Sequence, residues 1–266
     1  MTGPAVAVGR PPGPGSPAVD DALADLAAQH TELWGLLDGL GPAGWAAPSP
    51  CEGWDVGDVV LHLTQTDELA LDALRGDLDA AIEDYMRGED AVDEAAASSV
   101  AAARGVAGAA VGRRWQVTAA ALRGAFTVVD PSTRVQWVAG TLSARTLAAT
   151  RLAECWIHTT DVATALGTEV APTARLRHVA RLAWRTLPYA FARAGRELHG
   201  PVAFDLTAPE GGAWGFGTDD DPTTVVRGSG ADLCRVAGRR VDPADTDLVA
   251  SGPDGAAVLE LVRTYA

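Results

Sequence analysis

A polar stripe runs along one predicted helix, the segment RLAECWIHTTDVATALG at residues 151–167. At 100° per residue, four polar side chains fall within about 80° of one another; they are Arg151, Glu154, His158 and Asp161. Glu154 and His158 stand four residues apart, so both can reach one point above the helix. The rest of the perimeter is largely apolar, which predicts a buried helix whose carboxylate and imidazole are paired or metal-bound. A polar face turned toward water is the alternative.

A second histidine lies inside an apolar run, in the segment VVLHL at residues 59–63. Its predicted helix spans about residues 56–74 and follows Asp55, a typical N-cap residue. If this helix faces the one that carries Glu154 and His158, His62 completes a set of two histidines and one carboxylate. Such a set leaves positions open for water or substrate, as catalytic zinc sites do, and a similar set can hold iron. A core histidine bonded to a neighbour is the alternative for His62.

These segments resemble the motifs of a known family. The phrase PCEGWDV at residues 50–56, followed by VVLHL, is similar to the start of the mycothiol-dependent maleylpyruvate isomerase family, within the DinB-like metal-binding bundles. The phrase RLAECWIHTTDV at residues 151–162 is similar to the family's second motif in order and spacing. GADL at residues 230–233, followed by Gly238 and Arg239, resembles its C-terminal domain. The resemblance covers about residues 20–260.

The resemblance implies roles for individual residues. It makes His62, Glu154 and His158 the metal ligands and Asp161 a polar catalytic residue beside the metal. It makes Arg239 a substrate-binding residue that reaches in from the C-terminal domain, although the adjacent Arg240 can occupy the same place in the motif. It also implies zinc or another divalent metal, and mycothiol as the thiol cofactor.

Such a site would suit thiol chemistry on a small molecule. A thiol is mostly protonated at neutral pH, and a divalent metal deprotonates a thiol that it coordinates. The thiolate could add to an electron-poor double bond, allow rotation and leave, which is cis–trans isomerisation, or it could stay attached, which is thiol transfer. Asp161 could orient a ligand or move a proton, and an arginine could clamp a substrate carboxylate.

Three other interpretations stay open at the level of sequence. The first is a thiol-independent metal-dependent cyclase or hydrolase in natural-product metabolism, in which the metal is a Lewis acid or activates water. The second is a non-catalytic module that binds a small molecule or a metal. The third is a structural bundle whose polar stripe faces solvent.

Helices are expected to position these residues. Apolar spacing predicts helices over about residues 19–40, 56–74, 107–128 and 143–166, which together favour a four-helix bundle within residues 18–170. Residues 67–94 hold eleven acids and two arginines, and we expect them to form a solvated helix face and a mobile connection. Residues 1–17, with five prolines and four glycines, are predicted to be a disordered tail.

The pattern changes after Pro172. Residues 171–196 are predicted to hold a linking helix, and residues 197–266 a small α+β domain with strands near 202–206, 214–216, 223–227 and 248–250. Net charge supports the division, because residues 1–170 carry 23 acids and 10 arginines, whereas residues 171–266 carry 12 acids and 11 arginines. The expected fold class is therefore α+β, with an N-terminal bundle first.

Composition excludes several classes of protein. The 266 residues carry a net charge of −14, which opposes binding to nucleic acid or anionic lipid. We find no apolar run of membrane-spanning length and no signal peptide. Three cysteines make no disulfide framework. We therefore expect a cytoplasmic monomer or homodimer that acts on a small molecule. Basic residues are all arginine, as in high-GC actinobacteria that make mycothiol.

The remaining histidines and the cysteines are assigned lesser roles. His30 is expected to be a structural core histidine, and His178 and His199 to be solvated. The thiols are expected to be packed and inert rather than nucleophilic; they are Cys51, Cys155 and Cys234. If a thiolate performs the chemistry, it should therefore arrive with a cofactor.

Overall fold

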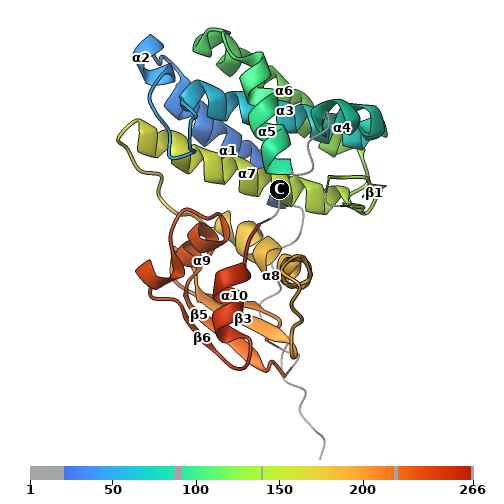
Figure 1. Ribbon diagram of the computed structural model, residues 1–266, viewed down its shortest axis with the longest axis vertical. Coiled ribbons are helices and arrows are strands. Elements are labelled where there is room, and N and C mark those ends of the chain that lie inside the picture. Colours follow the sequence, from blue (N-terminus) through green and yellow to red (C-terminus); the bar gives the residue numbers. More distant parts are fainter. Residues whose placement is uncertain (1–20, 87–91, 139, 219–220, 265–266) are drawn as a thin grey trace, which may run out of the picture.

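The computed structural model describes residues 21–86, 92–138, 140–218 and 221–264. A helical bundle is followed by a smaller part in which helices pack on a sheet, and Figure 1 shows the two parts stacked along the long axis. This arrangement confirms the predicted α+β class with an N-terminal bundle. The tail predicted at residues 1–17 lies outside the described residues.

Four long helices make the bundle, and each matches a predicted segment within a few residues. They are α1 (Asp21–Leu37), α3 (Val56–Arg75), α6 (Gly108–Val128) and α7 (Ala144–Ala165). Helix α3 packs on α6 and α7, and α1 packs on the same two helices. Asp55 and Asp58 form a capping box at the start of α3, and Ser143 caps α7. Both caps satisfy amide groups that a helix start leaves free.

The acidic stretch at residues 67–94 is more ordered than predicted. It contains the end of α3, then α4 (Leu78–Met86) and the start of α5 (Val92–Ala103), which pack on each other and on α3. The described acids at residues 77–94 are exposed, as expected of a solvated face, but Asp67, Tyr85 and Ala95 are buried, so the stretch also has a buried face that was not predicted. Small and apolar side chains make most of this buried face, and Asp67 is a buried acid among them. The connection at residues 87–91 lies outside the described residues.

Two short elements were also not predicted. Helix α2 (Pro42–Trp45) precedes the loop that leads into α3, and a two-stranded hairpin joins β1 (Arg134–Val135) to β2 (Leu142–Ser143) just before α7. Each element is too short to give a periodic signal in the sequence.

The C-terminal part contains a four-stranded sheet in the order β4-β3-β5-β6. Its strands are β3 (Val202–Thr207), β4 (Ala213–Phe216), β5 (Thr224–Ser229) and β6 (Val249–Ser251). Strands β3 and β5 are parallel, and the other neighbours are antiparallel. All four strands lie at the predicted places within a residue or two.

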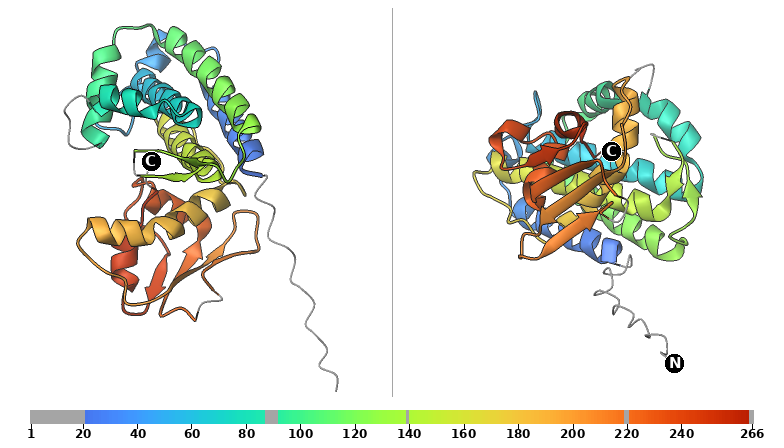
Figure 2. Two further views of the ribbon diagram at one scale, coloured as in Figure 1. Left: turned by 90° about the vertical axis from the view of Figure 1, so that its right-hand side faces the viewer. Right: turned by 90° about the horizontal axis from the view of Figure 1, so that it is seen from below.

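Three helices cover this sheet. They are α8 (Leu176–Arg193), α9 (Gly230–Ala237) and α10 (Gly255–Leu261). Helix α8 was predicted to be a linker, but its apolar side chains belong to the core of the sheet, and the helix lies between sheet and bundle (Figure 2). It is therefore an integral part of the C-terminal core.

Helix α7 lies where the two parts meet. It contributes side chains to three apolar clusters of the described residues, one of them shared with the C-terminal sheet. The side chains that α7 contributes to these clusters are those of Leu147, Ala148, Leu152, Ala153, Cys155, Trp156, Ile157 and Val162. The predicted burial of this helix is confirmed, so its polar residues are buried as well.

Among the described residues, no helix combines the length and the apolar character that a membrane crossing requires.

Candidate active site

Two helices bring the three predicted ligands together. His62 lies on α3, and Glu154 and His158 lie one turn apart on α7. The Oε2 atom of Glu154 is 3.5 Å from Nε2 of His62 and 3.7 Å from Nε2 of His158. One ligand atom from each residue lies within 4.8 Å of the others, and all three side chains are buried. The three residues come together because α3 and α7 face each other.

The spacing of these atoms fits a bound cation. Two ligand atoms on one tetrahedral zinc ion, each about 2.0–2.2 Å from the metal, lie roughly 3.4 Å apart. The distances of 3.5 Å and 3.7 Å from Oε2 of Glu154 to the two imidazole nitrogens are close to this ligand-to-ligand distance. Both are long for hydrogen bonds. Two imidazoles and one carboxylate are also a donor set that zinc prefers, and they leave further coordination positions open. The residues present therefore fit a divalent metal.

The electrostatics of His62 and Glu154 favour the forms that bind metal. Burial lowers the pKa of His62, so this ring is neutral. Burial alone would raise the pKa of Glu154, but contact with His62 and the charges of His158 and Arg151 outweigh it and lower that pKa to about 2. A neutral imidazole and an ionised carboxylate are the ligand forms.

Asp161 orients the second histidine. Its Oδ2 lies 2.9 Å from Nδ1 of His158, which leaves Nε2 of the same ring directed at Glu154. A carboxylate bonded to the far nitrogen of a ligand histidine fixes the orientation of the ring and raises its basicity. Burial would raise the pKa of Asp161, but hydrogen bonds from His158 and Arg240 outweigh it and hold the pKa well below its usual range.

Arg240 connects this centre to the C-terminal part. Its Nε and Nη2 lie 2.6 Å from Oδ1 and Oδ2 of Asp161, a bidentate pair, and its Nη1 donates to the Gly238 carbonyl oxygen at 2.8 Å. The predicted arginine was Arg239, which lines the same cavity and donates to the Glu260 carbonyl oxygen at 3.1 Å. The structure thus places both arginines at the cavity and pairs Arg240 with Asp161.

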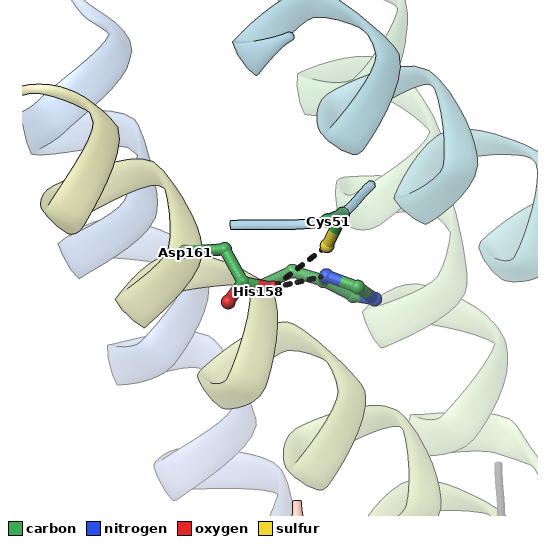
Figure 3. Close-up of side chains that lie close together, drawn as sticks. All are labelled: Cys51, His158 and Asp161. Atoms are coloured by element: carbon green, nitrogen blue, oxygen red, sulfur yellow. Dashed lines mark hydrogen bonds and ion pairs between the residues drawn. The ribbon is translucent and has the colours of Figure 1, made fainter. Parts of the chain in front are cut away.

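Cys51 was predicted to be a packed, inert thiol, and the structure places it beside the centre. Its Sγ donates to Oδ2 of Asp161 at 3.3 Å and lies 3.7 Å from Nη2 of Arg240, and Figure 3 shows the thiol and the His158 ring directed at one carboxylate. Cys51, His158 and Asp161 also form a second possible metal-binding group. Because Arg240 already donates to both oxygens of Asp161, a cation is disfavoured there.

A buried ion pair locks α7 against α3. Nε of Arg151 donates to Oδ1 of Asp67 at 2.9 Å, and Nη2 donates to Oγ1 of Thr66 at 2.8 Å. Thr66 in turn donates to the backbone oxygen of His62. Arg151 is 1% exposed and Asp67 is 2% exposed. The pair therefore fixes the register of the two helices that carry the ligands, a role that the sequence did not reveal for Asp67.

A cavity of about 740 Å³ opens over the centre. Both parts of the chain line it: the bundle supplies the proposed ligands, and the C-terminal part supplies arginines. Those arginines are Arg193, Arg239, Arg240 and Arg263. The volume is within the usual range of small-molecule sites.

The other three histidines and the other two cysteines belong to neither possible metal-binding group of the described residues. His30 is buried against Trp115, as expected of a core histidine. His199 is exposed, as predicted, and contacts Asp254, whereas His178 is half-buried and contacts Asp25 of α1. Cys155 and Cys234 are buried, and burial raises both thiol pKa values. These two thiols are inert at neutral pH.

Known proteins resemble this chain in sequence and in fold. The model of the mycothiol maleylpyruvate isomerase N-terminal domain matches residues 26–163. Uncharacterized proteins from two strains of Mycobacterium tuberculosis are each 32% identical over 250 residues, which cover 92% of this chain and 95% of the relative. Crystal structures of the mycothiol-dependent maleylpyruvate isomerase and of a histidine-to-alanine mutant share the fold, with a TM-score of 0.57, 18% identity, and coverage of 88% of this chain and 93% of theirs.

We expect Asp161→Asn to lower the pKa of His158 in metal-free protein. Burial opposes the charged imidazole, but contacts with Asp161 and Cys51 outweigh it and raise the pKa of His158 to about 9. Because the unfolded value is about 6.5, the protonated ring stabilises the fold fully below that pH, and the contribution is lost as pH rises through 9. NMR titration of the ring measures this directly. A value near 6.5 in both proteins would contradict the assigned contacts.

Arg240→Met should destabilise the fold, and Arg239→Met is its matched control. Loss of Arg240 leaves a buried carboxylate with one partner fewer, which should lower the free energy of unfolding by about 1–3 kcal/mol. Loss of Arg239 on the exposed surface should change it by about 0.5 kcal/mol or less. Urea denaturation at neutral pH compares the two. Equal losses would show that the pair with Asp161 does not hold the two parts together.

Proposed function

Because this chain belongs to the mycothiol maleylpyruvate isomerase family, we propose that it is a metal-dependent enzyme that uses a low-molecular-weight thiol of the mycothiol type. It would isomerise a small electrophilic substrate or transfer the thiol to it. The observation that carries the proposal is the convergence of His62, Glu154 and His158 on one point in the lining of a cavity.

Each residue of the centre has a proposed task. His62, Glu154 and His158 would hold a divalent cation, for which zinc fits the donor set. When bound, such a cation supplies a Lewis acid that lowers the pKa of a thiol beside it. Asp161 keeps the His158 ring in the orientation that turns Nε2 toward Glu154, and Arg240 holds Asp161 ionised. The protein residues thus supply the geometry and the charge balance.

The substrate and the thiol would share the cavity. Its volume of about 740 Å³ accommodates a small thiol together with a small electrophile. Arg193, Arg239 and Arg263 place positive charge on the wall opposite the bundle, in a chain whose net charge is −14. These guanidinium groups favour an anionic substrate and hold it near the cation site.

The proposed isomerisation conserves atoms and electrons. The thiol first gives its proton to the medium and takes one back when it leaves. The thiolate sulfur forms a bond to one carbon of an electron-poor double bond, and the π electron pair moves into the attached carbonyl group. Rotation follows about what is now a single bond. The electron pair then returns, the carbon–sulfur bond breaks, and the thiol is regenerated beside the trans product. If a proton instead adds to the carbon next to the carbonyl group, the thiol stays attached and the reaction is a transfer of the thiol to the substrate.

We predict that Glu154→Gln abolishes thiol-dependent turnover. The substitution removes the one anionic ligand of the set while it keeps the size of the side chain, so the loss should exceed about 100-fold in kcat/KM. The assay follows maleylpyruvate in the presence and absence of mycothiol, with protein loaded with zinc. Glu52→Gln is the matched control, because Glu52 is an exposed carboxylate at the rim of the same cavity.

Three outcomes separate the proposal from its alternatives. Turnover that needs both thiol and Glu154 supports it. Turnover of a substrate without any thiol favours a cyclase or hydrolase. Tight binding of a small molecule without turnover favours a non-catalytic module. Full activity of the Glu154→Gln variant would contradict the proposed metal site itself.

A further inference from the structure

The bundle wall of the cavity holds three buried hydrogen-bond donors that the proposed chemistry does not use. They are Nη1 of Arg151, the hydroxyl of Tyr85 and Nε1 of Trp137, and none has a hydrogen-bond partner among the described residues. The three residues are 1%, 9% and 6% exposed, and all three line the cavity over the proposed metal centre. A buried donor without a partner costs about 1–3 kcal/mol. Their gathering at one cavity indicates a ligand that accepts hydrogen bonds.

The guanidinium of Arg151 is held rigidly with one nitrogen to spare. Asp67 accepts from Nε and Thr66 accepts from Nη2, so the plane of the group is fixed. The remaining nitrogen, Nη1, is buried and lies on a residue one turn before Glu154. A fixed guanidinium loses little entropy when it binds an oxygen, which makes it a prepared donor.

Tyr85 and Trp137 are donors at neutral pH as well. Burial raises the pKa of Tyr85 to about 12, and the charge of Glu154 adds to the effect, so the hydroxyl stays protonated. An indole nitrogen can only donate. Both side chains belong to one buried cluster, yet they come from α4 and from the connection between β1 and β2. Separate elements thus place donor residues in the lining of one cavity.

We propose that Arg151, Tyr85 and Trp137 form a carboxylate-binding subsite beside the metal centre. Donors alone, with one guanidinium among them, match an acceptor-only group with two oxygens. For the identity of the ligand, this inference rests on the proposed function: the carboxylate is that of the electrophile, and donors at its oxygens draw electron density from the attached double bond. The subsite thereby selects unsaturated acids over neutral electrophiles.

Binding of maleate to zinc-loaded protein tests the subsite without any turnover. Calorimetric titration should give saturable binding of maleate and none of the uncharged diamide maleamide. Tyr85→Phe and Trp137→Phe each remove one donor and keep an aromatic ring, and each should raise the Kd about tenfold. Tyr189→Phe removes a hydroxyl from α8, on another wall of the cavity, and should leave the Kd unchanged.

The readouts separate this inference from structural damage and from the proposed function. Circular dichroism, melting temperature and zinc content should match the wild type in each variant; if one variant fails to fold, the other carries the test. Maleate binding needs no thiol, so an inactive protein can still bind it. A wild-type Kd in both variants, equal binding of maleate and maleamide, or no binding by the wild type would overturn the subsite.

Discussion

Burial of the central turns of α7 is the constraint on which the site depends. The helix packs between the bundle and the C-terminal sheet, so four of its polar side chains are largely withdrawn from bulk water; these are Arg151, Glu154, His158 and Asp161. A buried charge is tolerated only with a partner, and each of these residues has one. Asp67 pairs with the arginine, Arg240 pairs with the aspartate, and His62 faces the glutamate.

Those pairings also assemble the molecule. The Arg151–Asp67 pair sets α7 against α3, and this contact brings His62 opposite Glu154. The Arg240–Asp161 pair draws the C-terminal part over the bundle, and the cavity exists because both parts wall it. A single buried helix thereby couples the metal-binding geometry, the docking of two structural parts and the space for a substrate.

Patterns within one helix were predictable from the sequence, whereas contacts between distant segments were not. The polar stripe of α7 and the apolar surroundings of His62 follow from periodicity, and both helices formed where the spacing indicates. Asp67 looks like one acid among many, because its partner lies 84 residues away. The choice between Arg239 and Arg240 depends on the turn after α9, which periodicity does not describe. Tyr85 lies in a stretch whose many acidic residues predict exposure to solvent, although one face of the stretch is buried.

The central claim is that His62, Glu154 and His158 hold a divalent cation. Elemental analysis of protein purified after growth with added zinc tests it most directly, alongside His62→Ala and, as a matched control, His199→Ala on the distant surface. We predict about one equivalent of metal per chain in the wild type and the control, and a large loss in the His62 variant. Absence of stoichiometric metal from the wild type, or equal metal in all three proteins, would contradict the account.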